Sequence, residues 1–347
     1  MALSSKAKEI LNRPDLIAKR DLWYERMYNV FHNVDSDWNR QYAFGLMGIF
    51  GKGKHDIYTE PELWVEDCLE DLAERYAVLE NETYFRPLCV GMDLYGVHYM
   101  DKILGADVFY QDDQWYNNYM TTPIGTLKAP DLEQNEVWSL TKRIIQAFLD
   151  ADVALPCLSL PVIASPLNVA VNLYGAEILV EMLCDPENAM KDLTLITNLQ
   201  CQIHTMCRAM VPADQLQCVA CDGRNQLPGY GQLCGCSTQL VSGPLYEEMI
   251  APLDEKLLSV YPNGGMIHLC GSHTQHIETF RNMKSLTSVQ INDRASDDLQ
   301  EYFEGLREDQ IIYYCPCEKV PLEKAMEITN GKRLVIVGNL EAPVQKR

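Results

Sequence analysis

The chain has 347 residues, of which 47% are hydrophobic, so it is long enough to bury one large core without requiring two domains. Its 29 lysine and arginine residues are outnumbered by 49 aspartate and glutamate residues, which gives a formal net charge of −20. That charge repels nucleic-acid phosphates and the anionic face of a membrane, and it argues against both as partners.

No apolar run reaches the length of roughly 20 residues that a bilayer crossing needs, and the first residues lack the apolar middle of a signal peptide. We therefore expect a cytoplasmic protein. The 13 cysteines are spread through a large chain, which predicts free thiols packed mainly in the core instead of a disulfide framework. The sequence leaves the oligomeric state open, with a homodimer as one option.

Residues 1–80 carry apolar side chains at three- and four-residue spacing with charges between them, which predicts helices. From residue 83 onward, short β-rich runs alternate with amphipathic stretches, the pattern of βα units around a parallel sheet. The eight runs are residues 83–91, 106–112, 153–162, 216–223, 265–271, 287–293, 310–317 and 333–339.

This alternation predicts an α/β fold in one structural domain overall. Residues 83–347 are expected to form a (β/α)8 TIM barrel, and residues 1–82 an N-terminal helical extension packed on it. An open doubly wound sheet is the alternative, because a strand count does not establish closure.

The best-marked chemical motif is His268 and Cys270, separated by one residue at the end of the fifth run. Residues two apart in a strand project on the same side, and an imidazole with a thiolate suits Zn²⁺ better than Mg²⁺ or Ca²⁺. Cys317, which closes the seventh run, is the predicted third ligand and is preferred over Cys315 because it lies nearer the rim. Three protein ligands would leave a tetrahedral zinc one open position, as at catalytic sites. The alternative is a hydrogen-bonded rim histidine with packed cysteines.

Asp222 and Asp293 lie at the ends of the fourth and sixth runs. We regard them as candidate catalytic residues, either in contact with the substrate or supporting the metal ligands. Capping of the helix that follows each run is the alternative interpretation.

Two more pairs of candidate ligands lie close to these positions. Cys234 and Cys236 belong to a Gly-rich loop expected to lie over a pocket at the catalytic rim, although C-x-C is a short spacing for a zinc pair. His273 and His276 follow the fifth run with the i, i+3 spacing of one helix face. They could complete a metal site, but solvated or cap-forming roles are the more common ones.

Three segments resemble matching parts of the uroporphyrinogen decarboxylase superfamily. They are the motif IHLCG at 267–271, the stretch SPLNVAVNLYGAEILVEMLCDPENAMKDL at 165–193 and the late VIVGNLEAP at 335–343. Residues 95–108 and 121–131 are also similar to the family's middle section, so the resemblance covers about residues 83–343.

That superfamily contains metal-free decarboxylases of uroporphyrinogen and zinc methyltransferases that move a methyl group between a corrinoid protein and a thiol. The decarboxylases resemble one another in an N-terminal arginine-rich stretch that binds substrate carboxylates, whereas this chain offers only Arg40 there. The methyltransferase branch is marked by H-x-C, which His268 and Cys270 match. Its third cysteine lies in a late Gly-Cys segment where this chain has Gly338-Asn339, so Cys317 would have to take that role.

The resemblance thus implies a zinc-dependent methyltransferase that binds one zinc per chain and uses a small thiol as substrate. The corrinoid would be carried by a partner protein, because no corrinoid-binding segment follows the expected barrel. The alternatives are a metal-free decarboxylase-like lyase and a non-catalytic barrel that serves as a binding subunit. Bound zinc separates the first hypothesis from the other two.

Overall fold

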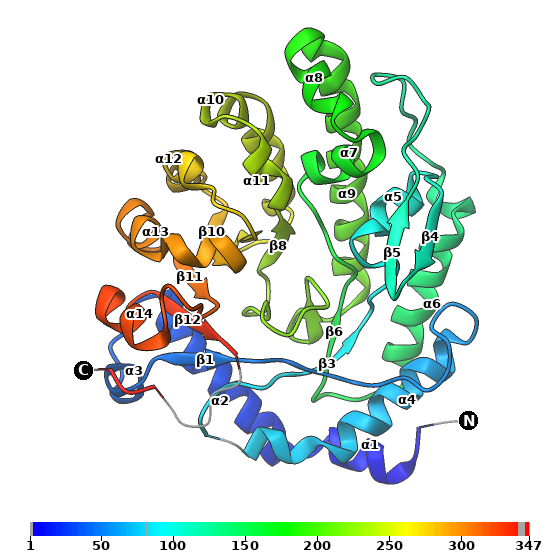
Figure 1. Ribbon diagram of the computed structural model, residues 1–347. Helices are drawn as coiled ribbons and strands as arrows, with labels where there is room; N and C mark the ends of the chain where they lie inside the picture. The colour runs from blue at the N-terminus through cyan, green and yellow to red at the C-terminus, as the bar shows by residue number, and fades with distance from the viewer. Residues whose placement is uncertain (1–2, 81, 339–343, 347) are drawn as a thin grey trace.

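The computed structural model describes residues 3–80, 82–338 and 344–346. Most of the described chain alternates between strands and helices (Figure 1). The segment 339–343, which is the end of the VIVGNLEAP stretch and includes Asn339, lies outside the described residues.

The N-terminal part is largely helical, as the apolar spacing predicts. Its helices are α1 (Ser5–Leu11), α2 (Pro14–Phe31), α3 (Asp37–Gln41) and α4 (Pro61–Glu74). Ser4 caps α1 by accepting a hydrogen bond from the Ala7 amide, and Pro14 begins α2, where its missing N–H costs nothing. Trp23 on the buried face of α2 stacks on Phe85, so this helix covers the ends of the strands.

Two parallel sheets form the centre of the molecule. A six-stranded sheet has the order β1-β12-β11-β10-β9-β8, and a four-stranded sheet has the order β2-β3-β6-β7. The strands are β1 (Phe44–Leu46), β2 (Ile49–Phe50), β3 (Leu88–Gly91), β6 (Cys157–Ser159), β7 (Leu216–Gln217), β8 (Gly231–Cys234), β9 (Gly265–Leu269), β10 (Leu286–Ile291), β11 (Ile311–Tyr314) and β12 (Leu334–Val337). Every residue of β9 is buried, as expected for a parallel strand covered on both faces.

The two sheets approach each other at both edges. Isolated parallel bridges connect Leu46 with Phe85 and Ala164 with Cys234, and β2 follows β1 directly along the chain. With the helices outside and the strands inside, the architecture is TIM-barrel-like (Figure 1).

Three parts of the predicted strand pattern are wrong. Residues 44–50 were expected to be helical, yet β1 pairs with β12 and β2 with β3. The run 106–112 is no central strand: it forms β4 (Val108–Gln111), which pairs antiparallel with β5 (Gln114–Asn117) in a separate hairpin. Asp112 and Asp113 both have positive φ, 49° and 59°, the conformation of a tight two-residue turn. Residues 231–234, expected in a loop, form β8 and pair with β9.

The remaining helices surround the sheets. They are α5 (Tyr99–Ile103), α6 (Glu136–Asp150), α7 (Pro166–Tyr174), α8 (Glu177–Cys184), α9 (Pro186–Met210), α10 (Gly243–Leu245), α11 (Ala251–Leu258), α12 (Ile277–Asn282), α13 (Leu299–Gly305) and α14 (Leu322–Thr329). Among the described residues no single helix is long and apolar enough to cross a bilayer, and α7 with α8 meets that test only as a pair bent by 113°.

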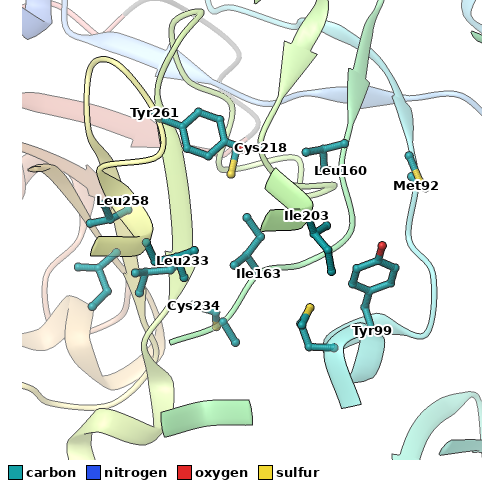
Figure 2. Close-up of a cluster of buried hydrophobic side chains, with 14 of the residues drawn as sticks. Met92, Tyr99, Leu160, Ile163, Ile203, Cys218, Leu233, Cys234, Leu258 and Tyr261 are labelled. Carbon is teal, nitrogen blue, oxygen red and sulfur yellow. The ribbon is translucent and has the colours of Figure 1, made fainter. Parts of the chain in front are cut away.

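A continuous apolar core fixes the position of β8. Figure 2 shows Leu233 and Cys234 of β8 among Leu258 of α11, Ile203 of α9 and Ile163, which follows β6. All 13 cysteines are free thiols, and several, such as Cys68 and Cys207, pack in the core as predicted. Cys184 is exposed and Cys201 partly exposed instead, because they face outward on α8 and α9.

Candidate metal centre at the strand ends

Neighbouring strands bring a histidine and a cysteine side by side. β8 ends at Cys234, which is in register with His268 of β9, one residue before that strand ends. Cys270 follows β9, and Cys236 begins the short 3-10 helix Cys236–Leu240 that follows β8. Since both strands are parallel, their carboxyl ends place these four side chains at one end of the molecule, where TIM-barrel enzymes carry their active sites.

The four donor atoms form a continuous chain, here called the thiol–imidazole cluster. His268 Nε2 lies 3.0 Å from Cys270 Sγ, the Cys236 thiol donates to Cys270 Sγ at 3.0 Å, and Cys236 Sγ lies 3.5 Å from Cys234 Sγ. The ligand atoms of Cys234, Cys236 and His268 all lie within 4.8 Å of one another. Thiolate sulfur and imidazole nitrogen are the donors of zinc sites, so the donor set fits that ion.

Gln290 orients the imidazole ring of His268. It lies beside His268 on β10, and its Nε2 donates to the Gly223 carbonyl at 3.1 Å, which leaves Oε1 as the acceptor for His268 Nδ1 at 2.7 Å. Nδ1 therefore donates to Gln290, and Nε2 faces the Cys270 sulfur, where its lone pair would be available to a metal once this nitrogen carries no proton. A second hydrogen bond of this kind is the usual support of a metal-binding histidine.

Hydrogen bonds within the cluster lower the pKa of two thiols. Hydrogen bonding with Cys236 is the largest cause of a pKa of about 4 for Cys270 and about 5 for Cys234, and the charges of His268 and Arg224 act in the same direction on both. The pKa of Cys236 is raised, because the neighbouring sulfurs of Cys234 and Cys270 both favour its protonated form. The metal-free cluster is therefore rich in thiolate at neutral pH, the form that binds a metal.

Asp222 and Asp293 lie at the same rim, around Cys315. Burial is the main cause that raises the Cys315 pKa to about 12, and the negative charges of Asp293 and Asp222 add to it. Both carboxylates are exposed, and Cys315 Sγ lies 3.9 Å from Gln290 Nε2. The two aspartates are thus close to the hydrogen-bond partner of His268, on the solvent side of the cluster.

The structure does not bring Cys317 into the thiol–imidazole cluster. Its thiol donates to Asp297 Oδ1 at 3.4 Å and accepts from the Val320 amide at 3.4 Å. β11 ends at Tyr314, so the alternation that would direct Cys315 and Cys317 to the same side stops before either residue. Cys234 and Cys236 occupy the place that the sequence pattern assigned to Cys317.

His273 and His276 bind backbone carbonyls instead of joining the donor set. The His273 ring places Nδ1 2.6 Å from Gly271 O and Nε2 3.2 Å from Gly235 O, and His276 Nε2 lies 2.9 Å from Thr238 O. Both histidines are fully buried. They connect the loop after β9 with the loop after β8 and so hold the two halves of the cluster together.

The architecture defines the fold class: the chain has a mixed α/β, TIM-barrel-like fold with parallel sheets. One solved structure that it resembles is a methyltransferase from Methanosarcina mazei, with a TM-score of 0.61 over 93% of this chain and 94% of that chain. The two sequences are 11% identical, so the likeness is one of fold. No protein-family model and no curated protein matches the sequence.

Proposed function

We propose that the protein is a zinc-dependent methyltransferase of the uroporphyrinogen decarboxylase superfamily that transfers a methyl group between a corrinoid protein and a small thiol. The observation that carries this proposal is the cluster of one imidazole and three thiols at the carboxyl ends of β8 and β9. The fold shared with a methyltransferase and the H-x-C motif support it.

The proposed ligands are His268, Cys270 and one of the two thiols Cys234 and Cys236, so that one position of a tetrahedral zinc stays open to the substrate thiol. Bound Zn²⁺ would supply the positive charge that keeps a substrate thiol in its nucleophilic thiolate form. Gln290 holds the His268 ring in the tautomer that presents Nε2. Asp222 and Asp293 are proposed to contact the substrate or a docking partner from the rim.

For the decarboxylase alternative, Arg224 is the arginine whose charge acts on Cys234 and Cys270, and one guanidinium does not match several carboxylates. Arg40, at the place of the family's arginine-rich stretch, is paired with Asp35 and Asp37. It lines a cavity with residues 330–333, which precede β12, and so lies at the amino-terminal end of the parallel strands, opposite the cluster. Desolvating several carboxylates without cationic partners would be costly.

Metal analysis of protein purified without added metal tests the proposal. We expect close to one zinc per chain, lost in His268→Ala and Cys270→Ala and retained in the matched control Cys184→Ser, whose thiol is exposed on α8. Single Cys234→Ser and Cys236→Ser variants then identify the third ligand. Zinc retained by both the His268 and Cys270 variants would contradict the site.

Methyl transfer is measured separately, with methylcobalamin as the donor and a panel of small thiols as acceptors. We expect thiol-dependent loss of the methyl–cobalt absorbance with the zinc-loaded protein and a loss of at least about 100-fold in rate for His268→Ala. Stoichiometric zinc without transfer to any thiol would show that the metal site exists and that the assigned reaction is wrong.

A further inference from the structure

A polar cavity lies at the other end of the molecule, lined by residues of α2 and α3, by the residues that follow α14 and by Lys346. Figure 1 shows where α2, α3 and α14 lie. Its volume is about 360 Å³. The lining residues are Asn29, Val30, Asn33, Val34, Asp35, Asn39, Arg40, Asn330, Gly331, Lys332, Arg333 and Lys346. Residues 330–333 immediately precede β12, so the cavity is at the amino-terminal ends of the parallel strands, opposite the thiol–imidazole cluster.

The charge of this cavity is opposite to that of the protein. Four lining residues are arginine or lysine and one is an aspartate, in a chain where acidic residues outnumber basic ones by 49 to 29. Arg40 is paired with Asp35 and Asp37, and the Arg333 guanidinium donates to the backbone carbonyls of Phe303, Leu306 and Arg307. These two guanidinium groups therefore already have partners within the protein, which leaves the two lysines as the candidate contacts for a ligand.

Lys332 and Lys346 both line the cavity, and the Lys346 side chain passes beside Gly331, the neighbour of Lys332. Burial lowers the pKa of Lys346, and the charge of Lys332 lowers it further, while no carboxylate of the described residues acts on it noticeably. The Lys346 ammonium donates to the Asn39 carbonyl. Like charges at the rim of one cavity repel, and an anion between them would turn this cost into attraction.

Asparagine amides supply the neutral donors that an oxyanion also requires. Asn29, Asn33, Asn39 and Asn330 all line the cavity. Asn39 is 7% exposed, and its Oδ1 has no hydrogen-bond partner among the described residues. A rotation of this amide by half a turn presents its NH2 group instead, since the two orientations have nearly the same shape.

We infer that this cavity binds a phosphate-type oxyanion, carried by a small molecule, between Lys332 and Lys346 with amide donors such as Asn39. Charge-assisted hydrogen bonds to ammonium groups are the strong contacts in such sites. The cavity exceeds the size of phosphate itself, which leaves room for an attached organic group. The inference is independent of the proposed function, because it concerns the opposite end of the strands.

Titration of inorganic phosphate into the full chain tests this site, followed by ³¹P NMR linewidth at an ionic strength held constant with chloride. We expect saturable binding of about one phosphate per chain, weakened about tenfold or more in Lys332→Ala and in Lys346→Ala. Lys191→Ala is the matched control, because its ammonium is paired with Glu187 on α9. Binding should also persist in His268→Ala, since the thiol–imidazole cluster is remote.

Thermal unfolding separates a ligand site from a structural role of the lysines. Without phosphate, Lys332→Ala should unfold at the same or a higher temperature than the unaltered protein, because repulsion with Lys346 is removed. With phosphate, only the unaltered protein and the control should gain stability. The inference would be overturned by absence of saturable binding, or by binding in both lysine variants as tight as in the unaltered protein. Loss of binding in His268→Ala, or a lower unfolding temperature of phosphate-free Lys332→Ala, would also overturn it.

Discussion

Replacing Gln290 by leucine tests whether the orientation of His268 matters for metal binding. The side chain is 3% exposed, and its two short hydrogen bonds are with His268 Nδ1 at 2.7 Å and with the Gly223 carbonyl at 3.1 Å, beside a longer one to Cys315 Sγ at 3.9 Å. Leucine has a similar volume and no polar atoms, so both partners would be left unsatisfied. Each such loss costs about 1–3 kcal/mol, which gives roughly 2–6 kcal/mol in the stability of the metal-free protein.

The effect on zinc affinity is separate from this loss of stability. With no acceptor for Nδ1–H, the ring is free to change its tautomer or its orientation, and zinc should bind about 10- to 100-fold more weakly. Gln290→Glu is the comparison variant, because it keeps an acceptor for His268 Nδ1, as in carboxylate–histidine–zinc sites, while it loses the donor to Gly223 and adds a negative charge.

Competition with a chromophoric chelator measures zinc affinity, and thermal unfolding of the metal-free protein measures stability. Gln290→Glu should retain zinc affinity within a few-fold of the unaltered protein. Unchanged affinity in Gln290→Leu would refute the idea that this hydrogen bond presents His268 Nε2 to a metal, whatever its effect on stability.

Three further outcomes follow from the cluster. In metal-free protein, Cys270 should react with iodoacetamide at a rate that changes little between pH 6 and 8, because its pKa is lowered to about 4. The rate at the exposed Cys184, measured by mass spectrometry in the same protein digest, serves as the comparison. At least one of Cys234→Ser and Cys236→Ser should weaken zinc binding more than Cys317→Ser, whose thiol donates to Asp297; equal effects of all three would contradict the proposed ligand set. His273→Ala should weaken zinc binding and lower the unfolding temperature, and an unchanged value of both would remove its role in joining the two loops.

The first half of the candidate site follows from the sequence because it depends on local spacing. His268 and Cys270 lie at the end of an apolar run, and β9 forms over that run in the structure. The second half depends on tertiary pairing. β8 is a four-residue strand among glycines, and it exists because it pairs with β9 and is bridged to Ala164. Local propensity carries little information about such a strand.

Two other differences between the sequence prediction and the structure also arise at positions where local strand propensity is a poor guide. Cys317 lies beyond the end of β11, where Pro316 has no N–H for the ladder, so its direction could not be read from strand alternation. The hairpin of β4 and β5 has the β-branched and aromatic composition of a central strand, and its two-residue Asp112–Asp113 turn was the signal against that assignment.

The position of β1 has a consequence for how the protein can be divided. β1 pairs with β12, and β2, which follows it, pairs with β3, so a segment from the first 50 residues closes one seam between the sheets. A fragment that began at residue 83 would leave the backbone groups of Leu334–Val337 on one side and of Leu88–Gly91 on the other without partners. Such bare apolar edges recruit strands from other chains, so this fragment should aggregate during expression, whereas shortening only α1 should be tolerated.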